Sequence, residues 1–202
     1  MKLYTFRAPN PFRVQVFLAE KGIELPQVTV NLPAGESRTA DFAKVNSLHE
    51  VPVLELDDGT RITESVAICR YLESLYPEPA LMGRTALEAA RTEMWNRRME
   101  FQIFGPIVQF ALHSFDFFAG KVHQFPDYGA SQKDLQVQKW AWLDRELSDG
   151  RTWVVDDRFS IADITGMAGV LVCGFAGLEI PADLVHARRW EAAVRARPSF
   201  DF

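Results

Sequence analysis

Residues 51–65, VPVLELDDGTRITES, decide how the first part of this 202-residue chain is expected to fold. Apolar residues alternate around Asp58-Gly59, a dipeptide favoured in the two-residue turns of β-hairpins. Pro52 has no N–H to donate to a sheet, so it indicates an edge or exposed backbone at the start of the first strand. The stretch therefore predicts strand, turn and strand, followed by the start of a helix.

The start of that helix has the chemistry of a binding site. Ser65, as its first residue, offers a hydroxyl and free backbone N–H groups that suit a carboxylate, and Glu64 suits an ammonium group. If the Val51–Pro52 bond is cis, the Val51 N–H and C=O would face outward and pair with another peptide. Together these groups fit a γ-glutamyl peptide. An ordinary hairpin followed by a Ser-capped helix is the alternative.

The segments before the hairpin predict a small α/β layer. Residues 2–6 and 28–30 have the pattern of strands, residues 12–21 and 65–76 that of helices, and Ala8–Pro11 that of a tight turn. A short helix carrying Phe42 is expected between the second strand and the hairpin. The order of elements indicates strands that change from parallel to antiparallel. We expect this domain to span residues 1–76.

The rest of the chain is expected to be helical. Pro77–Thr85 has the composition of a linker, and residues 86–202 show no clear strand alternation. A long helix is predicted over 86–119, with a kink at Pro106. Its two apolar stripes identify it as a central helix; one contains Phe101, Phe104, Val108, Leu112 and Phe115, and the other contains Met99, Ile103, Ile107 and Phe110. Further helices are expected over 131–148 and 188–195.

A capping box is expected near residue 160. Ser160-Ile161-Ala162-Asp163 places a hydroxyl and a carboxylate three residues apart, ahead of an apolar run. We therefore expect Asp163 to be structural rather than catalytic.

Val51-Pro52-Val53-Leu54 followed by Glu64-Ser65 resembles the glutathione site of cytosolic glutathione transferases, and the capping box resembles the one in their helical domain. The resemblance covers essentially the whole chain and is greatest to bacterial, nu/theta-like members. It implies a thioredoxin-like domain without the usual cysteine pair, then an all-helical domain, and a homodimer. It also implies that the Val51 backbone pairs with the cysteinyl part of glutathione, while Glu64 and Ser65 hold the γ-glutamyl end.

Glutathione chemistry requires a thiolate, whereas a free thiol has a pKa of about 8.5. A hydrogen-bond donor near the first helix would favour the anion. Residues 7–13, RAPNPFR, contain no Ser or Cys, and their Pro-Asn resembles nu-class chains, in which Asn10 would match an asparagine that contacts the sulfur. Asn10 is therefore the expected catalytic residue. Tyr4, at the spacing of the catalytic residue in tyrosine-type classes, is the alternative.

The sequence gives weaker signals for the residues that bind the glycine end of glutathione and for those that bind the acceptor. Arg38 is the candidate for the glycine carboxylate, with Lys44 and His49 nearby, but Glu50 stands where relatives often have Lys or Gln. An acceptor pocket is expected between the α/β layer and the helical domain; its candidates are Phe101, Phe104, Val108 and, for an anionic acceptor, Arg97.

Composition excludes several other classes. A net charge of −5 and a pI near 5.4 argue against nucleic acid as a partner. Two distant cysteines, Cys69 and Cys173, argue against a disulfide framework or a cysteine metal site. Without a recognisable signal peptide or an 18-residue apolar run, we expect a cytoplasmic protein that does not enter a membrane.

The sequence thus predicts a glutathione transferase that conjugates the glutathione thiolate to a small apolar electrophile, a detoxification reaction. Glutathione would be the co-substrate, and no metal is expected. Two alternatives remain open: a glutathione-dependent disulfide or peroxide reductase, and a non-enzymatic scaffold of the same fold.

Overall fold

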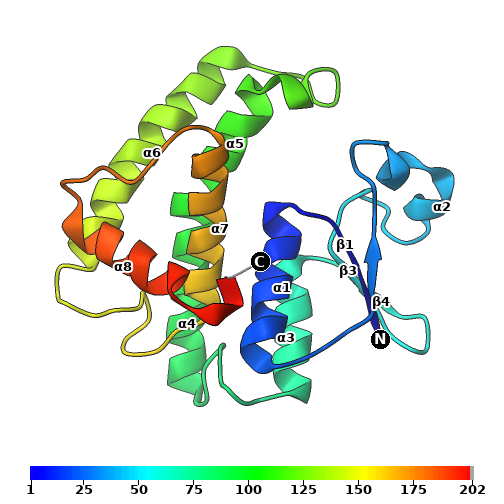
Figure 1. Cartoon of the computed structure of the whole chain (residues 1–202), viewed down its shortest axis with the longest axis horizontal. Helices are drawn as coiled ribbons and strands as arrows, with labels where there is room; N and C mark the ends of the chain where they lie inside the picture. Colours follow the sequence, from blue (N-terminus) through cyan, green and yellow to red (C-terminus); the bar gives the residue numbers. More distant parts are fainter. Residues whose placement is uncertain (201–202) are drawn as a thin grey trace. The chain divides into compact units, whose positions relative to one another are not determined.

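A computed structural model describes residues 1–200 of the chain. The chain divides into two compact units, Met1–Leu81 and Met82–Phe202. The division falls inside the segment 77–85 that the sequence marks as a linker. The first unit carries the sheet, and the second is helical (Figure 1).

The sheet of the first unit has the order β2-β1-β3-β4. Its strands are β1 (Lys2–Thr5), β2 (Gln27–Thr29), β3 (Val53–Glu55) and β4 (Arg61–Ile62). β1 pairs with β2 in parallel and with β3 antiparallel, and β3 pairs with β4 antiparallel. In the expected hairpin, Leu56 N–H donates to the Thr60 carbonyl at 2.8 Å, and Gly59 takes a φ of 85°, which glycine adopts without strain. The thioredoxin-like arrangement is confirmed.

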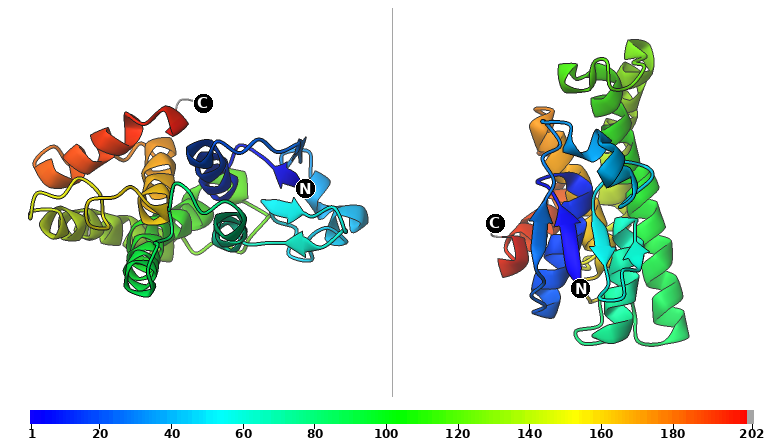
Figure 2. Two further views of the ribbon diagram at one scale, coloured as in Figure 1. Left: turned by 90° about the horizontal axis from the view of Figure 1, so that it is seen from below. Right: turned by 90° about the vertical axis from the view of Figure 1, so that its right-hand side faces the viewer.

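Helices cover both faces of this sheet. α1 (Pro9–Lys21) and α3 (Ser65–Leu75) lie side by side on one face (Figures 1 and 2). Leu3 of β1 is fully buried. Tyr4, the next residue of β1, points to the other face. There its ring contacts Phe42, which belongs to α2 (Ala40–Ala43), edge-on at 6.3 Å. α2 follows the 3-10 helix η1 (Glu36–Arg38).

The first helix begins three residues earlier than the sequence suggests. We expected a tight turn over Ala8–Pro11, but α1 starts at Pro9. Proline is tolerated at this position because the first N–H groups of a helix have no partner within the helix. Asn10 therefore lies in the first turn of α1 and not in a loop.

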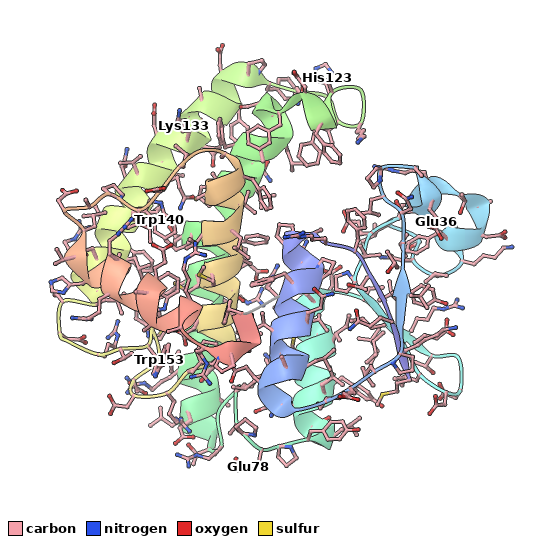
Figure 3. All side chains as sticks on the ribbon, in the orientation of Figure 1. Glu36, Glu78, His123, Lys133, Trp140 and Trp153 are labelled. Carbon is pink, nitrogen blue, oxygen red and sulfur yellow. The ribbon has the colours of Figure 1, made fainter. Side chains whose placement is uncertain are left out.

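The second unit is a bundle. Its elements are α4 (Ala86–Met99), the π-helix η2 (Glu100–Phe104), α5 (Gly105–Ser114), η3 (Asp116–Phe118), α6 (Pro126–Glu146), α7 (Ile161–Phe175), α8 (Val185–Arg195) and η4 (Pro198–Phe200). α7 packs against α4, η2 and α5, and is buried along most of its length. A Cβ on Gly169 would lie 3.1 Å from the Phe104 Cα, so this glycine permits the close approach. Trp140 of α6 lies among the interior side chains (Figure 3).

The long helix predicted over 86–119 is interrupted by η2. Gly105 N–H donates to the Glu100 carbonyl, five residues back, and Pro106 follows without an N–H of its own. The wider π turn changes the phase of the side chains. Phe101 is 62% exposed whereas Phe104 is buried, so the stripe predicted to contain both is not one continuous face.

Two helices of the second unit begin earlier than the sequence predicts. α6 and α8 begin at Pro126 and Val185, earlier than the predicted 131 and 188. Cys69 of α3 is fully buried, and burial raises the pKa of its thiol, as expected for a core residue. None of the helices described over residues 1–200 is both long and apolar enough to cross a membrane.

Candidate functional site

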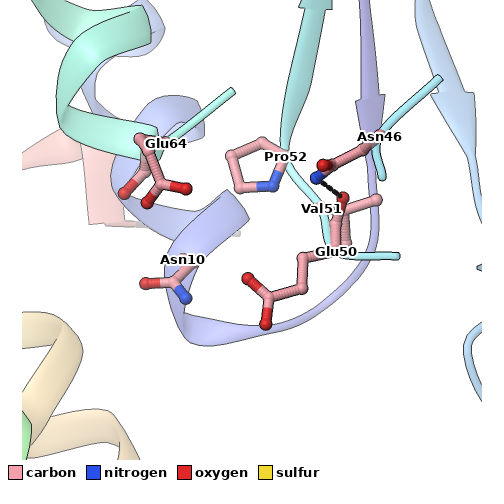
Figure 4. Close-up of a pocket in the computed structure, with 7 residues that line it drawn as sticks. Asn10, Asn46, Glu50, Val51, Pro52 and Glu64 are labelled. Atoms are coloured by element: carbon pink, nitrogen blue, oxygen red, sulfur yellow. Dashed lines mark hydrogen bonds between the residues drawn. The ribbon is translucent and has the colours of Figure 1, made fainter. Parts of the chain in front are cut away.

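A small pocket that is open to solvent lies in the first unit. Four separate segments meet there: the first turn of α1, the loop after α2, the start of the hairpin and the first turn of α3 (Figure 4). Its lining residues are Asn10, Asn46, Glu50, Val51, Pro52, Glu64 and Ser65. The pocket thus brings together five residues that the sequence analysis named for glutathione: Asn10, Val51, Pro52, Glu64 and Ser65.

The wall around Val51 is held by Asn46. The peptide bond between Val51 and Pro52 is cis. Asn46 Nδ2 donates to the Glu50 carbonyl at 2.8 Å, and Asn46 Oδ1 accepts from Leu48 N–H at 3.0 Å. Asn46 is a lining residue that the sequence did not predict. Its signal was an Asn at the start of a turn, where its side chain bonds backbone two residues further on.

Ser65 and Glu64 occupy the start of α3. Ser65 is the first residue of the helix, is 5% exposed and lines the pocket, so the free N–H groups of the first turn of α3 lie beside it. Glu64 precedes Ser65 with φ 65° and ψ 114°, a backbone conformation that residues other than glycine rarely adopt. Such a position costs on the order of 1–3 kcal/mol and is common at binding sites.

Asn10 has a fixed partner inside the protein. Arg13, one turn further along α1, donates from Nη2 to Asn10 Oδ1 at 2.5 Å. Arg13 is 4% exposed. The amide nitrogen of Asn10 lies on the side that faces the Glu50 carboxylate across the pocket (Figure 4).

The charge of the lining is negative. Glu50 and Glu64 contribute two carboxylates, and none of the seven described lining residues is Lys, Arg or His. Glu64 suits an ammonium group, as the sequence suggested. Glu50 is exposed, and its carboxylate would oppose any ligand carboxylate placed beside Val51.

The other candidates of the first unit lie elsewhere. Tyr4 donates from Oη to Glu55 Oε2 at 3.2 Å and is not a lining residue. Arg38 is exposed in η1, also outside the lining, so its contact with the glycine end stays a prediction. Lys44 Nζ pairs with Asp41 Oδ1 at 2.8 Å. His49 has φ 61°, and its Nδ1 lies 2.6 Å from the Ser37 carbonyl oxygen.

The acceptor candidates belong to the second unit. Phe101 is exposed, Phe104 is buried and Val108 is half-buried. Arg97 pairs with two carboxylates of its own helical segment, at 2.9 Å with Glu93 and 2.5 Å with Glu100. The charge of Arg97 is therefore already balanced within this unit.

Asp163 is the centre of a buried hydrogen-bond network, as its capping box suggested. Its Oδ1 accepts from Val154 N–H at 3.0 Å and from Trp190 Nε1 at 2.9 Å. Its Oδ2 accepts from Ser160 N–H at 3.0 Å and from the Ser160 hydroxyl at 3.2 Å. Burial raises the pKa of Asp163 to about 6, against the opposing effect of these donors. This arrangement joins α7, α8 and the loop before α7.

Comparison with known proteins agrees with the fold. Residues 1–74 match the family model described as "Glutathione S-transferase, N-terminal domain". The chain is 35% identical to glutathione S-transferase 2 of Saccharomyces cerevisiae over 195 residues, which cover 95% of this chain and 83% of that protein. It is 31% identical to the maleylacetoacetate isomerase of Pseudomonas aeruginosa, covering 98% and 86% of the two chains.

Solved structures give the same answer. A glutathione S-transferase domain-containing protein from Marinobacter aquaeolei VT8 superposes with a TM-score of 0.94 at 38% identity, covering 99% of this chain and all of the other. Gtt2 from Saccharomyces cerevisiae gives a TM-score of 0.92 at 34% identity, covering 100% and 99%. With similarity of this degree along its whole length, the chain belongs to the cytosolic glutathione S-transferase family.

Proposed function

We propose that this protein is a glutathione transferase that holds glutathione in the pocket of its first unit and conjugates the thiolate to a small apolar electrophile. The observation that carries the proposal is the meeting of Asn10, Val51, Glu64 and Ser65 in one pocket, from three segments far apart in the sequence. Each of these groups matches one functional group of the tripeptide.

The γ-glutamyl end of glutathione has an ammonium and a carboxylate. In the proposed complex the carboxylate accepts hydrogen bonds from the Ser65 hydroxyl and the free N–H groups at the start of α3. The ammonium pairs with the Glu64 carboxylate, and the cysteinyl amide pairs with the Val51 backbone. These contacts would direct the sulfur toward the first turn of α1.

Asn10 is the proposed donor to the sulfur. A neutral amide N–H stabilises a thiolate more than a thiol, so it lowers the thiol pKa. The first turn of α1 adds further N–H groups and the positive end of the helix dipole. Glu50 and Glu64 act in the opposite direction because their negative charge disfavours a second anion.

The chemistry then follows from the thiolate. Its electron pair forms a C–S bond to an electrophilic carbon while the leaving group departs with the pair of the bond that breaks. The proton of the thiol has already gone to solvent. For the acceptor we retain the apolar residues Phe101, Phe104 and Val108 as candidates. Because Arg97 is already paired with two carboxylates, an uncharged acceptor is favoured over an anionic one.

A second candidate activity is glutathione-dependent isomerisation. The similarity to a maleylacetoacetate isomerase over 98% of the chain favours it. The same thiolate would add to a conjugated double bond and leave again after rotation, so glutathione would be regenerated. The pocket described above would serve both reactions without change.

The test has two stages. Calorimetric titration with glutathione should give one site per chain, with S-methylglutathione as a ligand that cannot form a thiolate. Chloronitrobenzene, hydroxyethyl disulfide and a cis-configured conjugated diketo acid then distinguish conjugation, disulfide reduction and isomerisation. Glutathione binding without turnover of any of the three would favour the non-enzymatic scaffold, and absence of binding would contradict the proposal.

A cytoplasmic homodimer is part of the proposal. On the second unit Leu87, Met94 and Phe101 recur at seven-residue spacing and are 69%, 41% and 62% exposed. On the first unit, Leu75 and Tyr76 at the end of α3 are also exposed. Exposed apolar side chains on one helical face are typical of a subunit interface. Sedimentation analysis of Met94→Glu should show a shift from dimer to monomer.

A further inference from the structure

The hydrogen bond between Arg13 and Asn10 settles which way the Asn10 amide points. An arginine side chain carries only donors, so the Asn10 atom that meets Arg13 Nη2 at 2.5 Å must be the oxygen. The NH₂ group is thereby left at the other edge of the planar amide. That side faces the pocket (Figure 4).

Without this bond the orientation of Asn10 would be undetermined. An asparagine amide can rotate by half a turn about its last side-chain bond and exchange its oxygen for its nitrogen. In one orientation it offers a donor to the sulfur, and in the other it offers an oxygen that would repel a thiolate. A contact with a group that can only donate excludes the second orientation.

Arg13 is itself held in place. It lies in α1 one turn after Asn10, and its side chain is 4% exposed. A buried, charged donor makes a hydrogen bond that is shorter and stronger than one between neutral groups. It also polarises the amide that accepts from it, which strengthens the N–H on the far side as a donor.

We propose that Arg13 is a positioning residue for catalysis, which orients the Asn10 amide so that its N–H₂ group faces the sulfur of bound glutathione. Arg13 acts through Asn10 and does not itself line the pocket. The inference rests on the proposed function, because it needs glutathione in this pocket with its sulfur near Asn10.

The measurable consequence is the pKa of the bound thiol. The charged groups around the proposed position of the thiol are the Glu50 and Glu64 carboxylates of the lining, and Arg13, which bonds Asn10. The variants below leave both carboxylates unchanged. Ultraviolet absorbance of the thiolate, followed against pH with glutathione bound, should show a rise of about one unit for Asn10→Ala. A similar rise is expected for Arg13→Met and a smaller one for Arg13→Lys.

A double variant separates the two routes by which Arg13 could act. If it acts through Asn10, Arg13→Met adds nothing further to Asn10→Ala, so the double variant titrates like Asn10→Ala alone. If Arg13 acts by its own charge, Arg13→Met raises the thiol pKa equally in the wild-type and Asn10→Ala backgrounds, and that result would overturn the proposal. An unchanged pKa in Arg13→Met that folds and binds glutathione would overturn it as well.

Asn10→Asp provides a test that does not remove the buried arginine. Aspartate keeps the acceptor for Arg13 but replaces the NH₂ group with a second oxygen. The thiol pKa should therefore rise further than in Asn10→Ala. A pKa equal to or below that of Asn10→Ala would overturn the proposed orientation. If Arg13→Met fails to fold, Arg13→Lys, measured in the wild-type and Asn10→Ala backgrounds, carries the same test of Arg13.

Gln15→Leu is the matched control on the same helix. Gln15 Nε2 bonds Thr5 Oγ1 at 3.3 Å, away from the pocket lining, and its replacement should leave the thiol pKa unchanged. Calorimetry on each variant separates this inference from the proposed function. If the wild type does not bind glutathione, both the proposed function and the role of Arg13 are overturned. If the wild type and the variants bind glutathione but the thiol pKa values do not follow the pattern above, only the role of Arg13 is overturned.

Discussion

The Tyr4 hydroxyl donates a hydrogen bond to Oε2 of Glu55 at 3.2 Å, across the pair of strands β1 and β3. Glu55 also pairs with Lys2 at 2.9 Å and with Arg61 at 2.8 Å. Because of these two cations, the pKa of Glu55 is lowered to about 2, so it remains an anionic acceptor at neutral pH. Tyr4, the alternative donor to the glutathione sulfur, thus already donates its hydroxyl hydrogen bond to a residue of the neighbouring strand.

Tyr4→Phe should therefore leave the thiol pKa of bound glutathione and kcat/KM nearly unchanged. The removed hydroxyl bonds Glu55 and lies outside the described pocket lining. Thiolate absorbance against pH, measured beside Asn10→Ala, checks this directly. If Tyr4→Phe alone raised the pKa, the protein would be a tyrosine-type enzyme and the assignment of Asn10 would be wrong.

Ser65→Ala should weaken glutathione binding by roughly 1.5–3 kcal/mol, the range for a hydrogen bond to a charged group. Ser65 lines the pocket, and its hydroxyl is the proposed partner of the γ-glutamyl carboxylate. Calorimetry gives the dissociation constant. Ser74→Ala on the same helix is the control, because Ser74 Oγ donates to the Tyr71 carbonyl at 2.7 Å and is exposed. Equal constants for both variants would contradict the assignment of Ser65.

Glu50→Gln should tighten glutathione binding, roughly two- to five-fold, since a carboxylate is removed from a lining that holds two. The gain should shrink at high ionic strength because exposed charges are screened. Titrations at low and high salt measure both effects. Glu24→Gln changes an exposed carboxylate outside the lining and is the control. Weaker binding in Glu50→Gln would mean that this carboxylate contacts a positive group of the ligand.

Loss of a single helix cap costs about 0.5–2 kcal/mol. Asp163→Ala should lower the free energy of unfolding by more than this. Four donors from Val154, Ser160 and Trp190 would lose their acceptor inside the bundle. Urea unfolding measures the change. Asp134→Ala, on the exposed face of α6, is the control. Glutathione affinity of the folded variant should not change, and a normal stability with lost activity would contradict the structural role.

The stability difference between wild type and Asp163→Ala should depend on pH. The folded pKa of Asp163 is about 6, above the value of about 3.9 in an unfolded chain. Between these values the folded state holds a proton that the unfolded state has released, so the contribution of Asp163 is greatest below pH 4 and falls as pH rises to 6. The fall is on the order of 3 kcal/mol. Urea unfolding at pH 4, 5 and 7 checks it; a difference that grows with pH would show that the four donors outweigh burial.

Local sequence signals were enough for several elements. Asp58-Gly59 between short apolar runs specified the hairpin, because the turn depends on those residues alone. Ser160 and Asp163 specified the start of α7 for the same reason, since a capping box is made within four residues. Residues 51–65 also predicted most of the pocket, because four of its seven lining residues, Val51, Pro52, Glu64 and Ser65, belong to this one stretch.

Other features depended on contacts between distant residues or between turns of a helix. The prolines around Asn10 suggested a turn, but the first turn of a helix accepts them equally well, and the bond to Arg13 fixes the amide there. The Tyr4 hydroxyl donates a hydrogen bond to Glu55, a residue 51 positions away in the sequence. Asn46 enters the pocket through its bond to the Glu50 carbonyl. The sequence by itself thus determined the order of elements and most of the residues that line the pocket, because these rest on local backbone preferences. Only the tertiary structure decided which side chains face the pocket and in which orientation, because each of those orientations is set by a partner that local periodicity does not reveal.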